Sequence, residues 1–132
     1  ALFGPMLDDR TAACEELDVI NHKMWTNKNN RAGWSAYLGQ PAGMDEVADY
    51  AVPARREDLS GLPPTWIGIG DVDLFYAESK LYSEQLAASG VSCEFHTAPM
   101  APHAFELLAP DASITRDFFN SNYAFLRKLL NL

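Results

Sequence analysis

The chain has 132 residues, of which 48% are hydrophobic and 21% are charged, and this balance predicts one soluble globular domain. Its eight glycines and eight prolines follow no period, which excludes a collagen-like or low-complexity protein. The formal net charge of −8 argues against a nucleic-acid partner, because most of the surface would repel a polyanion. The longest uncharged run in the middle of the chain, Leu59 to Gly70, is too short to cross a bilayer.

The cysteine content indicates a reducing compartment. Cys14 and Cys93 lie too far apart to suggest a disulfide framework or a zinc site, both of which need clustered sulfurs at set spacings. The sequence has no glycosylation motif and no basic-then-apolar leader. We therefore expect two free thiols in a cytoplasmic protein.

The first half of the chain contains only weak signals for regular structure. Residues 2–7 form an apolar stretch that predicts a strand, and residues 15–28 have moderately helical spacing. Residues 34–39 predict a short helical turn that ends at a glycine, and residues 45–64 are expected to be mostly connection, with Arg55 and Arg56 on the surface. No repeat or linker divides the chain, so we treat residues 1–132 as a single unit.

The strongest pattern lies between residues 65 and 97. Residues 65–70 form a short apolar run bounded by prolines and an aspartate, as in a strand that is buried on both faces. Apolar residues then recur at helical spacing over residues 74–89, and Gly90 stands where a glycine would end the helix. Residues 91–97 alternate apolar and polar side chains, which predicts a half-exposed strand near a sheet edge. Strand, helix and strand together predict a right-handed βαβ unit with parallel strands.

A broad apolar stripe predicts a final helix that packs on the sheet. Its members include Ile114, Phe118, Phe125 and Leu129, and Asp111 is the expected N-cap. The chain as a whole therefore belongs to the α/β class.

Two loops of the predicted sheet carry side chains that can take part in acid–base catalysis. Asp71 and Asp73 follow the first parallel strand, and His103 lies in the loop after the second. Because ligands bind beyond the carboxyl ends of parallel strands, about 4.8 Å apart, an aspartate and the histidine there can meet. An Asp–His pair supplies two members of a Ser-His-Asp triad. The alternatives are an Asp73 that only caps the following helix and a His103 that is an ordinary loop residue.

Five stretches of the sequence, taken in order, resemble the C-terminal part of the hormone-sensitive-lipase-like esterases, a family of α/β hydrolases. They are PMLDDR (5–10), WSAYLG (34–39), DLSGLPPT (58–65), GDVDLF (70–75) and APHAF (101–105). The resemblance covers almost the whole chain. It implies a partial α/β-hydrolase fold with about three parallel C-terminal strands and flanking helices.

The resemblance also implies the roles of individual residues. Asp73 would be the triad acid and His103 the general base, with Asp71 as the runner-up acid. The family needs neither a cofactor nor a metal. Met100 and Ala104 replace glycines that are frequent around the histidine, and the side chain of Met100 is expected to reshape the loop.

The nucleophile of the family is a serine in Gly-x-Ser-x-Gly, next to an HGGG-type oxyanion loop, and neither motif occurs in these 132 residues. We therefore interpret the chain as the C-terminal part of a carboxylic-ester hydrolase for small acyl esters, without the nucleophile-bearing N-terminal part and inactive alone. The alternatives are a non-catalytic interaction or oligomerisation module, and a fragment of an α/β-hydrolase peptidase. An unpaired strand edge at residues 2–7 predicts a homo-oligomer or association with the missing part.

Overall fold

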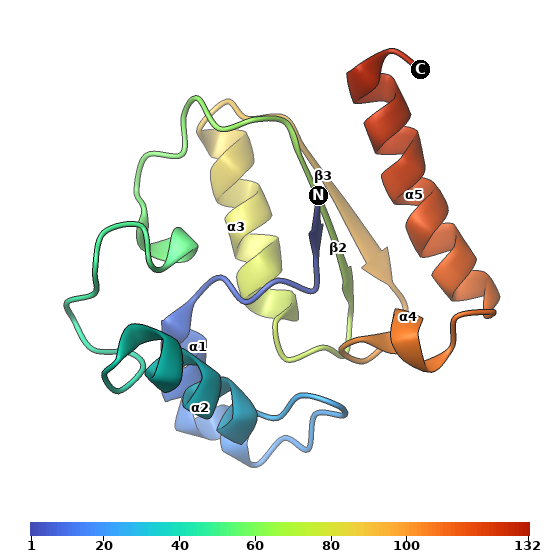
Figure 1. Cartoon of the computed structure of the whole chain (residues 1–132). Coiled ribbons are helices and arrows are strands. Elements are labelled where there is room, and N and C mark those ends of the chain that lie inside the picture. The colour runs from blue at the N-terminus through green and yellow to red at the C-terminus, as the bar shows by residue number, and fades with distance from the viewer.

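The computed structural model describes all 132 residues, and a parallel sheet of three strands lies at its centre (Figure 1). The strands are β1 (Leu2–Phe3), β2 (Thr65–Gly70) and β3 (Cys93–Ala98), in the spatial order β1-β2-β3. The register pairs Leu2 with Ile67 and Thr65 with Cys93. The predicted βαβ unit is therefore confirmed, with β2 and β3 as immediate parallel neighbours.

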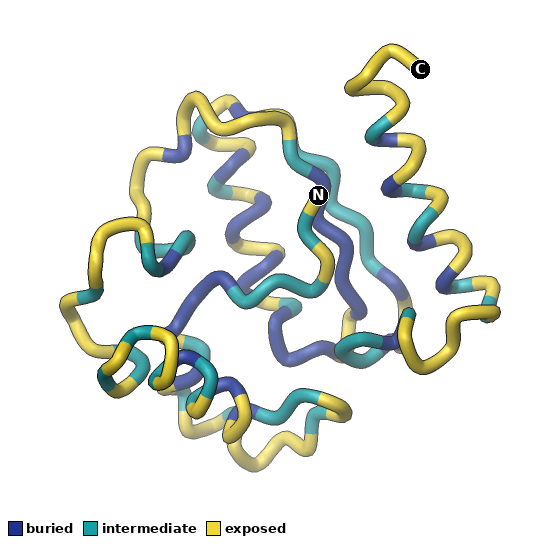
Figure 2. Tube along the Cα trace, in the orientation of Figure 1, coloured by how far each residue is buried: buried dark blue, intermediate teal, exposed yellow.

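The central strand β2 is covered on both faces by helices, and every residue after Thr65 is buried (Figure 2). Alternate side chains of β2 point to opposite faces. Trp66 packs with Phe118 of α5 (Ser113–Leu130), whereas Ile67 packs with Leu86 of α3 (Tyr76–Ala88). The continuous apolar run predicted this double burial.

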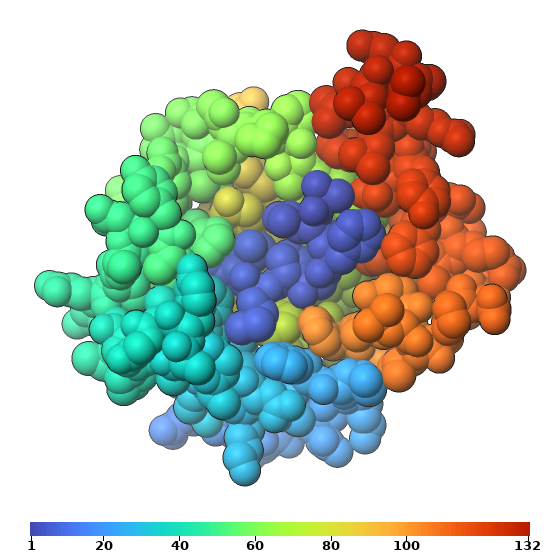
Figure 3. Space-filling model, in the orientation of Figure 1, coloured from blue at the N-terminus to red at the C-terminus, as the bar shows by residue number.

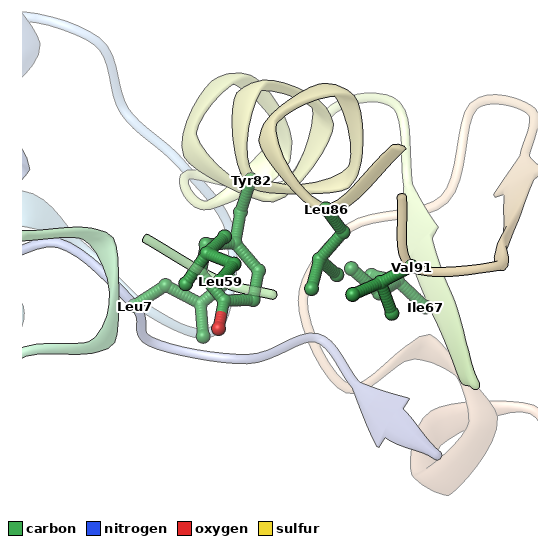
Figure 4. Close-up of a cluster of buried hydrophobic side chains, with 6 residues drawn as sticks. All are labelled: Leu7, Leu59, Ile67, Tyr82, Leu86 and Val91. Atoms are coloured by element: carbon green, nitrogen blue, oxygen red, sulfur yellow. The ribbon is translucent and has the colours of Figure 1, made fainter. Parts of the chain in front are cut away.

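Two apolar clusters hold these layers together. One joins β2 to α3 and consists of Leu7, Leu59, Ile67, Tyr82, Leu86 and Val91 (Figure 4). The other joins the sheet to α5 and consists of Trp66, Ala98, Ala101, Phe105, Phe118 and Phe125. The second cluster includes residues of the loop after β3, so packing against α5 also holds the start of that loop.

The N-terminal strand is shorter than expected. Residues 2–7 predicted one strand, but β1 ends at Phe3 because Gly4 adopts a left-handed φ of 47° and a proline follows. A short helix that the sequence did not predict, α1 (Asp9–Ala13), comes next, and the Asp8 side chain caps it by accepting from the Arg10 backbone N–H.

The prediction of a helix over residues 15–28 is wrong. Only Glu15–Asp18 form a 3₁₀ turn, and α2 begins at Asn27, where the Thr26 hydroxyl caps it. The helix α2 (Asn27–Leu38) ends, as expected, before Gly39, whose φ is 69°. The start of α2 was missed because a polar run of three asparagines and one lysine begins it, without an apolar stripe.

Two details of the C-terminal half also differ from expectation. Ala112 and not Asp111 occupies the N-cap of α5, and no side chain caps this helix. A single turn of helix, α4 (Phe105–Leu108), follows the histidine loop. Residues 45–64 are connection, as expected, apart from the 3₁₀ turn Pro53–Arg55.

Arg55 was expected on the surface, but it forms a largely buried ion pair. Its Nε lies 2.8 Å from Asp9 Oδ1 and its Nη2 lies 2.9 Å from Asp9 Oδ2. The Asp9 side chain is fully buried and the Arg55 side chain is 17% exposed. Burial alone would raise the pKa of Asp9, but the bonds from Arg55 and from the Gly43 N–H outweigh it and lower that pKa. This pair ties α1 to the connection before β2.

A buried glutamate links α3 to the segment between β1 and α1. Glu78 Oε1 accepts the Leu7 N–H at 2.6 Å and the Asp8 N–H at 3.2 Å, whereas its other oxygen is buried without a partner. Burial raises the pKa of Glu78 from its ordinary 4.5 to about 7.

The raised pKa of Glu78 predicts that this residue lowers the free energy of unfolding in a pH-dependent way. Between pH 4.5 and about 7 the unfolded chain ionises Glu78 more readily than the folded chain, so this group lowers stability as the pH rises. In urea unfolding at pH 5 and pH 8, we expect Glu78→Gln to gain stability relative to wild type, on the order of 2–3 kcal/mol more at pH 8. Glu84→Gln, at an exposed position of the same helix, should show no such difference. A Glu78→Gln effect that is equal at both pH values would contradict the prediction.

The outer edge of β1 pairs with no other strand. Phe3 is 42% exposed, and the N-terminal residues lie at the surface in the middle of the face drawn in Figure 3. Association through this edge stays a prediction. None of the helices combines the length and the apolarity that a membrane crossing requires.

Candidate active site

Asp73 lies in the turn between β2 and α3, and its two carboxylate oxygens have different partners. Oδ1 accepts the Phe75 N–H at 3.0 Å, and Oδ2 lies 2.9 Å from Nδ1 of His103. The side chain of Asp73 is 2% exposed. The alternative that Asp73 only caps the following helix is wrong, because Phe75 is the N-cap of α3 and no side chain caps this helix. One oxygen of Asp73 supports the turn before α3 while the other contacts the histidine.

His103 lies in the loop after β3, and apolar groups surround its ring. Phe75 packs edge-on at 5.4 Å between ring centroids, and the Trp25 ring lies at 6.0 Å. A Cβ on Gly4 would lie 3.5 Å from Asp73 Oδ2 and from His103 Nδ1, so this glycine brings the backbone after β1 directly against the pair. The side chain of His103 remains 24% exposed.

The electrostatics of the pair favour the charged imidazole. The hydrogen bond to Asp73 raises the pKa of His103 above its ordinary 6.5, and burial opposes this shift less strongly. An aspartate on Nδ1 fixes the tautomer with the proton on that nitrogen, which leaves Nε2 able to accept a proton. The arrangement can therefore act as an oriented general base.

Asp71, the runner-up acid, does not contact the histidine. Its Oδ1 accepts the backbone N–H of Met100 at 2.6 Å, in the same loop as His103. The pattern of strands and helices could not separate the two aspartates, because both follow β2 and the turn conformation decides which one faces the histidine. The family resemblance favoured Asp73.

The two residues that replace glycines around the histidine both have left-handed backbone conformations. Met100 has a φ of 55° and Ala104 has a φ of 56°. A side chain at such a φ costs about 1–2 kcal/mol, which is the physical reason for a glycine preference at both positions. The Met100 side chain is 81% exposed, so it projects away from the loop interior rather than narrowing it.

Two hollows lie in this region, and the smaller one adjoins the pair. A small pocket of about 190 Å³ is lined by Asp73 and His103 together with Phe3, Phe105, Glu106 and Phe118. A larger apolar pocket of about 500 Å³ is lined by the four aromatic residues Trp25, Trp34, Tyr37 and Tyr50. Trp25 lines the larger pocket, and its ring also lies 6.0 Å from the ring of His103. Aromatic residues at helical spacing are more often core than pocket, and Trp34, at 4% exposed, is buried and also lines the larger pocket.

Some site residues were missed from the sequence. Gly4 and Phe75 contact the histidine or its partner, yet neither was a candidate. The glycine before Pro5 was the available signal for Gly4, because a Gly-Pro pair marks a turn at the end of a strand. No serine hydroxyl is hydrogen-bonded to His103, whose side-chain bond is to Asp73.

Comparisons with known proteins show the family of the chain. The sequence family of the alpha/beta hydrolase fold matches residues 1–107, and the chain belongs to this family. Carboxylesterase NlhH of Mycobacterium tuberculosis is 41% identical over 59 residues, which are 42% of this chain and 18% of NlhH.

Solved structures agree with this assignment. The esterase LipW from Mycobacterium marinum is 34% identical with a TM-score of 0.77, over 89% of this chain and 36% of LipW. An esterase of the bacterial hormone-sensitive lipase family, 20% identical over 96% of this chain and 41% of its own, shares the fold with a TM-score of 0.78. The resemblance to hormone-sensitive-lipase-like esterases is thus confirmed, and the chain spans well under half the length of these relatives.

Proposed function

We propose that this chain supplies the acid, Asp73, and the general base, His103, of a Ser-His-Asp triad for the hydrolysis of carboxylic esters. The observation that carries the proposal is the 2.9 Å contact between Asp73 Oδ2 and His103 Nδ1, at the carboxyl ends of neighbouring parallel strands. The family and the esterase relatives support the reaction class.

The proposed mechanism follows from the orientation of the imidazole. His103 Nε2 takes the proton of a serine hydroxyl as that oxygen attacks the ester carbonyl, and Asp73 stabilises the resulting imidazolium. His103 then gives the proton to the leaving alcohol as the acyl-enzyme forms. In the second half His103 removes a proton from water, which attacks the acyl group, and His103 then gives that proton to the serine oxygen as the acid is released. Because no Gly-x-Ser-x-Gly occurs in the 132 residues, the proposal places the serine and the oxyanion hole outside them.

The surroundings of the pair favour an apolar ester. The larger pocket is lined mainly by aromatic and aliphatic side chains, and Trp25 connects it to His103. An apolar acyl or alcohol group would bury carbon surface there, which contributes about 25 cal/mol per Å² removed from water. The proposed substrates are therefore small esters with an apolar substituent.

A chimera tests the proposal. Residues 1–132 replace the matching segment of LipW, so that the rest of the active site comes from that esterase. We expect this chimera to hydrolyse p-nitrophenyl butyrate, and we expect no turnover from the 132-residue chain alone. His103→Gln is the inactive control. A folded chimera that turns over equally well with His103→Gln would contradict the proposal, and turnover of p-nitroanilides in preference to esters would favour the peptidase alternative.

The absence of the nucleophile motif also supports a second candidate, a non-catalytic interaction module that uses the open edge of β1. Light scattering of the chain distinguishes the two. A stable oligomer that dissociates on the substitution Phe3→Asp, combined with an inactive chimera, would favour the interaction module.

A further inference from the structure

Asp71 makes a contact that neither the fold nor the proposed triad requires. It follows β2 directly, is exposed, and directs its carboxylate across to the loop after β3, where Oδ1 accepts the Met100 N–H at 2.6 Å. An exposed carboxylate would otherwise be solvated by water. Its partner Met100 lies three residues before His103 in the chain, so Asp71 is a candidate to control the position of the histidine.

The two loops are joined by further bonds at the same place. The backbone N–H of Asp71 donates to the Ala98 carbonyl at 3.1 Å, and the Val72 N–H donates to the Ala101 carbonyl at 3.4 Å. A Cβ on Gly70 would lie only 1.9 Å from the Ala101 carbonyl oxygen, so the loops are in direct contact. The Asp71 side chain adds a third bond to this junction, which lies beside α4 in Figure 1.

The histidine loop needs such support because it contains local strain. Met100 and Ala104 bracket His103 with left-handed φ values, which non-glycine residues rarely adopt. Conformations of this kind persist only where surrounding contacts over-determine them. The bond from Asp71 reaches the backbone N–H of Met100, the first of the two strained residues.

We propose that Asp71 is a positioning residue, whose carboxylate holds the Met100–Ala104 loop so that His103 Nδ1 stays within reach of Asp73 Oδ2. The importance of this role for catalysis rests on the proposed function, but the positioning is a property of this chain alone. Asp71 acts through the loop backbone and not through its charge, since the groups that raise the pKa of His103 are Asp73 and Glu106.

The test uses the 132-residue chain and NMR. Asp71→Ala removes the acceptor, Asp71→Asn keeps an oxygen that can accept, and Asp58→Ala is the matched control. Asp58 is also exposed and accepts a backbone N–H, that of Ser60 at 2.9 Å, but it precedes β2 and lies at the opposite end of that strand. If Asp71→Ala does not fold, Asp71→Leu takes its place, because its side chain also lacks an acceptor.

We expect Asp71→Ala to speed amide exchange at Met100 about tenfold. In the same variant the low-field Nδ1–H signal of His103 should weaken, and the pKa of His103 should fall toward its ordinary value. Asp71→Asn should restore all three readouts, and Asp58→Ala should change none. In the LipW chimera, Asp71→Ala should lower kcat about tenfold with KM unchanged.

An unchanged Nδ1–H signal and an unchanged titration of His103 in Asp71→Ala would overturn the positioning role. Loss of the Nδ1–H signal in Asp71→Asn would also overturn the positioning role. Asn keeps an accepting oxygen, so the hydrogen bond to Met100 would then not be what maintains the signal. Failure of the proposed function looks different: the Nδ1–H signal is absent from the wild-type chain, or the chimera retains turnover with His103→Gln.

Discussion

Asp73→Asn in the LipW chimera should lower kcat for p-nitrophenyl butyrate by about 10⁴-fold. Asp73 Oδ2 accepts from His103 Nδ1 at 2.9 Å, and an amide placed there no longer holds the imidazole with its proton on Nδ1. The ring then carries its proton on Nε2, where it cannot accept one from the serine. Initial rates over a range of substrate concentrations measure the change, and KM should move far less than kcat.

Asp73→Asn changes the contact with His103 and leaves the turn into α3 in place. The Asn side-chain oxygen can still accept the Phe75 N–H, which Asp73 Oδ1 binds at 3.0 Å, so the turn into α3 is retained. Asp71→Asn is the paired comparison, because it removes a charge from the same turn and keeps an accepting oxygen for Met100. We expect it to lower kcat by less than about tenfold. If the two effects were reversed, Asp71 would be the acid and the assignment of Asp73 would be wrong.

The part of the fold that the sequence predicted well is the part that local patterns determine. The run 65–70 is apolar on both faces, and the structure buries β2 on both faces for that reason. Gly90 ends the α3 segment with a φ of 77°, as its position predicted. Once β2 and β3 are parallel neighbours, the loops after the two strands lie at the same edge of the sheet, so an aspartate after β2 and His103 could be placed together from the sequence.

The sequence could not predict the N-terminal third, because buried polar contacts and not apolar periodicity organise it. Asn27 is almost fully buried, and its amide donates to the Cys14 carbonyl at 3.0 Å and to Asp18 Oδ1 at 2.8 Å. Such a residue reads as exposed in any hydrophobicity pattern. The same reason explains why Arg55 was misplaced: its partner Asp9 lies 46 residues away in the chain.

Arg55→Leu should destabilise the chain by about 3 kcal/mol at pH 7. The substitution leaves the carboxylate of Asp9, which is fully buried, with the Gly43 N–H at 2.7 Å but without its charged partner. Removing one member of a buried pair costs far more than removing an exposed charge, because the remaining ion cannot be solvated. Urea unfolding followed by circular dichroism measures the change. Arg56→Leu is the matched control, since Arg56 lies next in sequence and its guanidinium stacks over Tyr50 at 5.8 Å, and it should cost less than about 1 kcal/mol.

The pH dependence separates this explanation from a simple loss of packing. In the wild-type chain the pKa of Asp9 is lowered, so the stability from the pair is present above the ordinary carboxyl pKa and is lost as the pH falls through the lowered value. In Arg55→Leu the pKa of Asp9 should rise, because burial is then opposed only by the backbone bond, and Asp9 takes up a proton on acidification. The deficit of the variant should therefore shrink between pH 7 and pH 4. A deficit that stays constant over this range would mean that Arg55 contributes through its aliphatic stem and not through its charge.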